Sequence, residues 1–303
     1  MMPTSPARAA PEQVTLSARD GYRLVALRYP VRGAPKARLI VAGGTGVPQR
    51  FYRRFAEHAS ARGFATLTLD FRGIGLSRHT TLKGFRGDQL DWVNLDLVTV
   101  VEALASDTVP LFMVGHSFGG HAFGMLPNHD RVAALYTFGT GAGWHGWMTP
   151  KERLKAIVMW RAVAPAIARW KGYLAWSLLG MGEDLPLGVY RQWKRWCQLP
   201  HYFFDDPTMQ YIVERFERVR APIIAANALD DPWAPPASRD AFMAGYRNAD
   251  WRGIDIDPTT IGVRGLGHMG YFRAGAEALW DHALDWFEQR AQHATPPLIA
   301  TAP

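Results

Sequence analysis

The chain has 303 residues but only one cysteine, Cys197. A single thiol excludes an intrachain disulfide and any zinc site built from several cysteines. The sequence also lacks an uncharged apolar run of about 18 residues, the length that a transmembrane helix needs. Residues 1–11 contain no apolar segment of the kind that a secretory signal carries. We therefore expect a soluble cytoplasmic protein.

The excess of one charge sign is small: 34 Lys and Arg stand against 27 Asp and Glu, a net charge of +7. No nucleic-acid-binding motif accompanies this excess, so we expect no nucleic-acid partner. The basic residues are concentrated between positions 144 and 220, which hold 12 of them against 7 acidic residues. The same segment contains seven of the twelve tryptophans, at positions 144, 147, 160, 170, 176, 193 and 196. This change in composition predicts a separate module.

Short apolar runs alternate with segments of helical periodicity in the rest of the chain, which predicts a mainly parallel sheet with helices on both faces. The turn signal Asp20-Gly21 between two further runs predicts an antiparallel edge hairpin, which brings the sheet to eight strands. The expected strands are 14–17, 24–29, 37–42, 64–69, 109–114, 132–138, 222–227 and 255–263. The expected helices are 49–62, 88–106, one from about 238, and 271–289. Ligands bind such sheets at the carboxyl ends of the strands.

The segment Gly115-His116-Ser117-Phe118-Gly119-Gly120 follows one apolar run and precedes an expected helix. A G-x-S-x-G pattern in this context predicts a nucleophile elbow, a sharp turn that lifts the serine hydroxyl above the sheet. Side chains two positions before and after the serine would collide in this turn, so both positions are glycine. Ser117 is therefore the candidate nucleophile, and a glycine-rich turn with an incidental serine is the alternative.

A serine hydroxyl needs a base, and the base needs a group that orients it. His268 lies in a glycine-rich segment after the last expected strand, where the loop leaves room for an imidazole. Asp230 and Asp231 both follow the run 222–227, so either one is a candidate orienting acid. Four other histidines are expected to be structural or solvated: His116, His121, His129 and His145.

These features together resemble the α/β-hydrolase fold serine hydrolases. The resemblance rests on 70–77 (DFRGIGLS), 115–120 (GHSFGG), 231–235 (DPWAP) and 265–270 (GLGHMG). It covers residues 12–143 and 221–290, and it implies the α/β-hydrolase fold with a helical cap inserted after the sixth strand. Because this fold hosts many chemistries, it says little about the substrate.

The resemblance also implies site residues. It suggests a catalytic triad of Ser117, His268 and Asp231, because Asp231 alone has proline four residues later, as in the family's D-x-x-x-P loop; Asp230 is the alternative. Dehalogenases and epoxide hydrolases of this fold use an aspartate nucleophile, so they are excluded. Arg72 resembles a family arginine that ties down its loop, and we expect it to be structural.

The oxyanion-hole loop departs from the family pattern. Many members have His-Gly at the end of the third strand, where this chain has Ala42-Gly43. Main-chain N–H groups can still form the hole. We expect that of Phe118 to act together with that of Gly44 or Thr45.

The tryptophan-rich segment 144–220 occupies the place of the family's cap, between core segments 12–143 and 221–290, and we expect flexible tails at 1–11 and 291–303. Apolar side chains recur at three- and four-residue steps from Ile157 to Leu178, which predicts a helix. Two interpretations are compatible. The apolar face covers the core while the basic residues are solvated, or the cap lines an apolar acyl pocket and its basic rim faces anionic lipid or a charged acyl carrier.

The resulting expectation is a serine hydrolase that cleaves a carboxylic ester or thioester with an apolar acyl group, without a metal or organic cofactor. The first alternative is an acyltransferase, which passes the acyl group to an alcohol or amine. The second is a non-catalytic binding protein on the same scaffold. Neither the substrate nor the oligomeric state follows from the sequence.

Overall fold

Three neighbouring strands of the sheet bury every residue. They are β5 (Leu111–His116), β6 (Ala134–Phe138) and β7 (Ile223–Ala228). Short apolar runs form such strands when helices cover a parallel sheet on both faces. The computed structural model describes residues 10–293.

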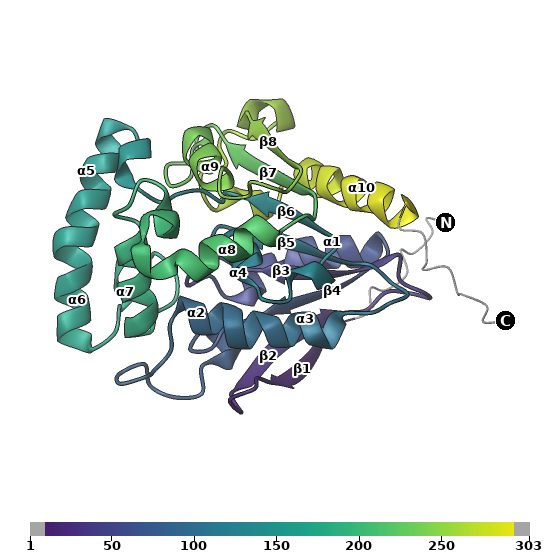
Figure 1. The fold of residues 1–303 in the computed structure, drawn as a ribbon, viewed down its shortest axis with the longest axis horizontal. Helices are drawn as coiled ribbons and strands as arrows, with labels where there is room; N and C mark the ends of the chain where they lie inside the picture. Colours follow the sequence, from purple (N-terminus) through teal and green to yellow (C-terminus); the bar gives the residue numbers. More distant parts are fainter. Residues whose placement is uncertain (1–9, 294–303) are drawn as a thin grey trace, which may run out of the picture.

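Eight strands form one sheet in the order β1-β2-β4-β3-β5-β6-β7-β8 (Figure 1). The other five are β1 (Glu12–Ser17), β2 (Arg23–Tyr29), β3 (Ala37–Ala42), β4 (Phe64–Leu69) and β8 (Trp251–Ile256). Strand β2 runs antiparallel to both of its neighbours, and all other neighbouring pairs are parallel. The predicted mostly parallel sheet with an antiparallel hairpin at its edge is confirmed.

Two helical layers cover this sheet. One contains α1 (Arg53–Ala61) and α10 (Glu277–His293). The other contains α2 (Gln89–Asp91), α3 (Val98–Leu104), α4 (Phe118–Met125), α8 (Gln210–Arg218) and α9 (Pro236–Met243). A π-helical stretch, Trp92–Leu97, joins α2 to α3 into one helix, as predicted for 88–106. Along β3, Leu39 and Val41 face the first layer and Ile40 faces the second, as a period of two requires.

Residues 144–209 leave the sheet after β6 and are called the insertion below. They form α5 (Pro150–Val158), α6 (Ala164–Lys171) and α7 (Leu187–Trp196), which stand at one end of the molecule (Figure 1). A π-helical stretch, Met159–Val163, joins α5 to α6. Helix α8 lies inside the predicted segment 144–220, yet it packs against α4 and covers the sheet. The part of the chain that stands off the sheet is therefore shorter than predicted.

Several predicted elements have shifted bounds in the structure, and the last strand and the last helix differ most. The strand expected at 255–263 ends at Ile256, because Asp257 caps a 3₁₀ turn, Pro258–Ile261, through a hydrogen bond from Thr259 N. The helix expected at 271–289 begins only at Glu277, after Gly275 adopts a φ of +94°.

Helix α10 also continues through residues 291–293, which were expected to belong to a flexible tail. The rest of the two predicted tails, 1–9 and 294–303, lies outside the described residues. Within residues 10–293, no helix combines the length and the hydropathy that crossing a bilayer requires.

Candidate active site

Ser117 sits between β5 and α4 in a backbone conformation that few non-glycine residues adopt. Its φ of +52° and ψ of −113° mark local strain. Hydrogen bonds hold this conformation: Ser117 N donates to Phe138 O at 3.0 Å, and Thr140 Oγ1 donates to Ser117 O at 3.0 Å. The turn exposes part of the serine at the carboxyl end of β5.

The glycines around Ser117 are required by contact distances. A Cβ atom at Gly119 would lie 1.9 Å from Ala42 O, and one at Gly115 would lie 2.5 Å from Gly120 N. Neither neighbour is a flexible side chain that could move aside. The steric reason given for both glycines in the motif is thus confirmed.

Asp231 and His268 meet at the neighbouring strand ends. Asp231 follows β7, and its Oδ2 and Oδ1 atoms lie 2.9 and 3.0 Å from His268 Nδ1. Asp231 Oδ1 also accepts hydrogen bonds from the N–H groups of Trp233 and Ala234, and Oδ2 accepts one from Tyr271 Oη at 2.9 Å. The carboxylate is completely buried, while the His268 side chain is 19% exposed.

These contacts keep Asp231 ionised. Burial alone would raise its pKa, but the charge and hydrogen bond of His268, together with the two backbone donors, outweigh burial and lower the pKa below its usual range. An ionised acceptor at Nδ1 fixes the imidazole so that Nε2 faces away from Asp231.

Asp230 makes different contacts. It is exposed, and its Oδ2 accepts a hydrogen bond from Leu266 N at 2.9 Å. It therefore braces the loop that carries His268, whereas Asp231 contacts the imidazole. The structure thus separates two adjacent aspartates that the residues alone left open.

Ser117 and His268 line one cavity of about 470 Å³. Within residues 10–293, Ser117 Oγ makes no hydrogen bond, so the serine and the imidazole face the same space without a direct bond. Catalytic hydrogen bonds are often long without substrate and tighten when it binds.

A network of hydrogen bonds, called the Tyr52 relay below, links Gly44, Tyr52, His116 and His268 beside this cavity. Tyr52 Oη accepts a hydrogen bond from Gly44 N at 2.8 Å and lies 2.8 Å from His116 Nδ1. His116 Nε2 lies 2.9 Å from His268 O, which can only accept, so Nε2 carries the proton and Nδ1 accepts from Tyr52. Burial lowers the pKa of His116 to about 3, which agrees with a neutral ring.

The hydrogen bond from Gly44 to Tyr52 limits which N–H groups can form the oxyanion hole. Because Gly44 N–H already donates to Tyr52, it is not available to a substrate oxygen in this structure, contrary to one of the two alternatives. Thr45 N–H has no partner among the described residues, and Thr45 lines the cavity. Phe118 begins α4, so its N–H has no partner within the helix.

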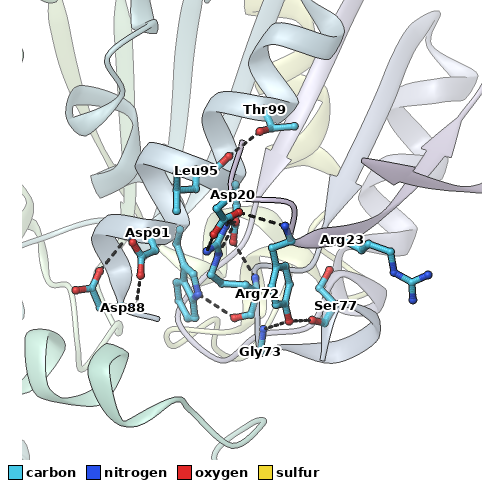
Figure 2. A network of polar contacts seen from close by, with 12 residues as sticks. Asp20, Arg23, Arg72, Gly73, Ser77, Asp88, Asp91, Leu95 and Thr99 are labelled. Atoms are coloured by element: carbon cyan, nitrogen blue, oxygen red, sulfur yellow. Dashed lines mark hydrogen bonds and ion pairs between the residues drawn. The ribbon is translucent and has the colours of Figure 1, made fainter. Parts of the chain in front are cut away.

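Arg72 lies in a polar network that does not line the cavity (Figure 2). Its guanidinium donates to Asp96 Oδ1 at 2.7 Å and to Asp20 Oδ2 at 2.6 Å. Trp92 Nε1 donates to the Arg72 carbonyl at 3.0 Å. Arg72 thus ties its loop to the edge hairpin and to the π-helical stretch, as a structural residue does.

The insertion supplies the other wall of the cavity. Trp176 and Trp193 line it, and their ring centroids are 5.7 Å apart. Trp193 also stacks on Trp233, two residues after Asp231, with the ring centroids 6.1 Å apart. Trp170 is 72% exposed, because the buried stripe of the insertion runs through Trp160, Ala164 and Ala168 instead. The predicted apolar face therefore holds for part of the segment and is wrong for Trp170 and for Leu178, which is 58% exposed.

Sequence reasoning missed Tyr52 and Tyr271, which hold His116 and Asp231. Both are buried tyrosines in segments expected to be helical, and neither lies in a motif. One sequence feature is linked to Tyr52, namely Gly43. A side chain at this position would clash with the tyrosine ring, because a Cβ atom would lie 2.9 Å from Tyr52 Cε2.

This chain is similar to a lipase and to a thioesterase domain. Monoglyceride lipase from Saccharomyces cerevisiae is 32% identical over 108 residues, which cover 33% of this chain and 34% of the lipase. This match thus spans about a third of the lipase's own length. A solved structure of a soluble variant of that lipase with a substrate analog has a TM-score of 0.64 at 18% identity, covering 95% of this chain and 98% of that one.

The thioesterase domain from the curacin biosynthetic pathway has a TM-score of 0.58 at 15% identity, covering 91% of this chain and all of that one. At these identities the structural likenesses show a shared fold. The sequence itself matches the profile of the alpha/beta hydrolase family over residues 39–281, a span that contains Ser117, Asp231 and His268. The chain therefore belongs to the alpha/beta hydrolase family.

Proposed function

We propose that this protein cleaves a carboxylic ester or thioester through an acyl-enzyme on Ser117. The observation that carries the proposal is the 2.9 Å contact between a buried, ionised Asp231 and His268, beside a serine held on a strained elbow. A serine, an imidazole and an orienting carboxylate are the groups that acyl transfer requires. The lipase and the thioesterase among the similar proteins support an acyl substrate.

In the proposed reaction, Ser117 Oγ attacks the substrate carbonyl carbon while His268 Nε2 takes the hydroxyl proton. The tetrahedral oxyanion collapses, the C–O or C–S bond to the leaving group breaks, and His268 returns the proton to that group. Water then attacks the acyl-enzyme with His268 again as base, which releases the carboxylic acid and regenerates Ser117. Asp231 stabilises the imidazolium that forms in both halves.

The oxyanion is proposed to bind the main-chain N–H groups of Phe118 and Thr45. Within residues 10–293, neither Phe118 N–H, at the start of α4, nor Thr45 N–H has a hydrogen-bond acceptor, whereas Gly44 N–H donates to Tyr52. Thr45 is fixed by a hydrogen bond from Gln89 Nε2 to its Oγ1 at 3.0 Å. Two preorganised donors of this kind typically contribute several kcal/mol to the transition state.

A panel of esters and thioesters with graded acyl length tests the proposal. The cavity wall includes Trp176, Trp193 and Trp233, so each buried CH₂ should add about 0.8 kcal/mol, or nearly fourfold in kcat/KM, until the space is filled. We expect turnover that rises from acetyl toward medium chains. The absence of turnover for every ester and thioester would overturn the proposal, and products that carry the acyl group on an added alcohol would identify an acyltransferase.

The exposed face of the insertion supports a further part of the proposal, contact with an anionic lipid surface. Arg169, Arg191 and Lys194 line one groove there, and Trp170, which follows Arg169 in the sequence, is exposed. Leu154, on α5 of the same insertion, is exposed as well. Basic and large apolar side chains on one helical module favour an anionic interface. Co-sedimentation with vesicles that contain phosphatidylserine, but not with phosphatidylcholine alone, is the expected result. The cytoplasmic location stays a prediction.

A further inference from the structure

One side chain in the catalytic cavity has no role in the proposed reaction. His121 lies one helical turn after Ser117 on α4 and lines the same cavity. Its Nε2 lies 2.8 Å from Gly141 O, so Nε2 carries the proton and Nδ1 is left as an acceptor. His121 is 5% exposed, and Nδ1 has no partner within residues 10–293.

A tyrosine of the insertion stands against this histidine. The ring centroids of Tyr202 and His121 are 4.6 Å apart, and Tyr202 also lines the cavity. Tyr202 is 1% exposed, and its hydroxyl has no hydrogen-bond partner in the described part of the chain. Its φ of +59° is a strained conformation for a large side chain, yet the fold keeps it there.

Two polar atoms that lack a partner among the described residues therefore belong to adjacent buried rings, both of which line the cavity. Buried donors and acceptors almost always have partners in native proteins, so a missing partner calls for an explanation. Their surroundings are apolar or neutral: Gly143 and Cys197 line the same region, and a Cβ atom at Gly143 would lie 2.8 Å from Cys197 Sγ. The arginines on the cavity wall, Arg50 and Arg273, are both exposed residues, and the imidazole of His268 is already paired with Asp231.

The charge state of the pair restricts what it can bind. Burial lowers the pKa of His121 to about 4 and raises that of Tyr202, so both rings are neutral near pH 7. Nδ1 needs a donor, and the phenol can donate. A carboxylate would enter without a buried cation to pair with, and a ketone could not donate to Nδ1. A single hydroxyl group satisfies both atoms, since it donates to one and accepts from the other.

We propose that His121 Nδ1 and Tyr202 Oη form a subsite for a hydroxyl group carried by the acyl chain of the substrate. This inference rests on the proposed hydrolase function, and it adds a substrate class to it: hydroxylated acyl esters or thioesters. The position of His121, one helical turn after the nucleophile that caps α4, places the hydroxyl inside the cavity rather than at the far end of a long chain.

The test compares one octanoyl ester with its monohydroxy isomers, in which the hydroxyl is moved along the chain. For at least one isomer we expect wild-type kcat/KM to exceed that of the octanoyl ester about tenfold, because the plain chain leaves two buried polar groups unpaired. Tyr202→Phe removes only the phenolic oxygen and should bring that ratio to about one. Binding of a water molecule alone at the pair would instead give a ratio near one in the wild type.

Tyr190→Phe is the matched control. Tyr190 is also a buried tyrosine near the insertion's tryptophans, and its hydroxyl likewise has no partner among residues 10–293, but it lines a groove that does not contain Ser117. In Tyr190→Phe, the ratio of kcat/KM for the preferred hydroxylated isomer to kcat/KM for the plain octanoyl ester should equal the wild-type ratio. An active enzyme with no preferred isomer, or a preference that survives Tyr202→Phe, overturns the subsite. Failure to turn over any of these esters would overturn the hydrolase proposal itself.

Discussion

The two walls of the catalytic cavity are held in place by different interactions. On the sheet side, backbone contacts and short hydrogen bonds position each group: Gly119 fits only because it has no Cβ, and Asp231 receives four hydrogen-bond donors. On the insertion side, aromatic rings pack at centroid distances of about 5–6 Å, as for the edge-to-face pair of Trp160 and Trp193 at 4.9 Å. Directional contacts fix atoms more narrowly than ring packing does.

This difference assigns different tasks to the two walls. Acyl transfer needs groups held within a fraction of an ångström, which the sheet side provides. Selection among acyl chains needs shaped apolar surface with a few polar groups, which the insertion provides. Substitutions on the sheet side should therefore change the rate for every substrate, whereas substitutions in the insertion should change the preference among substrates.

The largest effect is expected at the nucleophile. Ser117→Ala should lower kcat/KM for an activated ester by about 10⁴ to 10⁶, since no other group replaces the attacking oxygen. Ser177→Ala, a change in an exposed serine of the insertion, is the control and should have little effect. Steady-state kinetics of both variants measure this, and wild-type turnover by Ser117→Ala would contradict the account.

The adjacent aspartates provide the next test. Asp231→Asn keeps the side-chain shape but removes the charge that holds His268 in the active tautomer, and kcat should fall about 10⁴-fold. Asp230→Asn changes only an exposed carboxylate that accepts a hydrogen bond from Leu266 N, so kcat should fall less than tenfold. Equal losses in the two variants would show that the contact at His268 does not decide the rate.

The Tyr52 relay should have an intermediate effect. Tyr52→Phe leaves Gly44 N–H without its acceptor, and about a tenfold lower kcat is expected with little change in KM. The acid limb of the pH–rate profile should not move, because His116, with a pKa of about 3, is neutral throughout the working range. Tyr136→Phe is the matched control. It also breaks a tyrosine–histidine contact, the 3.0 Å contact between Tyr136 Oη and His282 Nδ1, but these residues do not line the cavity. An equal loss in this control would argue against positioning by the relay.

The smallest change in rate, and the clearest change in preference, is expected in the insertion. Trp193→Ala removes part of the cavity wall, so the rise of kcat/KM with acyl length should flatten by a few-fold over a medium chain. Trp170→Ala removes an indole that is 72% exposed and should leave the chain-length profile unchanged. Thermal unfolding of both variants separates altered selectivity from lost stability. Identical chain-length profiles in the wild type and in Trp193→Ala would show that this wall does not select among acyl chains, which contradicts the proposed difference between the two walls.

The same contrast explains what could be predicted from the sequence. The elbow around Ser117 could be predicted because the clash that requires Gly115 is with Gly120 N, only five residues later in the same turn. The Tyr52 relay could not be predicted, since Tyr52 and His116 lie 64 positions apart and their pairing depends on the finished sheet. Tyr202 was equally hidden, because a positive φ at a non-glycine residue leaves no local signal. The composition of 144–220 predicted aromatic packing, but not which tryptophan faces the cavity.

Covalent labelling with a fluorophosphonate probe tests the central claim most directly. Such a probe reacts with a serine activated by a neighbouring base. We predict a single adduct in the wild type, mapped by mass spectrometry to the peptide that contains Ser117, with labelling that slows strongly in His268→Ala. No adduct on the folded protein, or an adduct on another residue with Ser117 unmodified, would contradict the account.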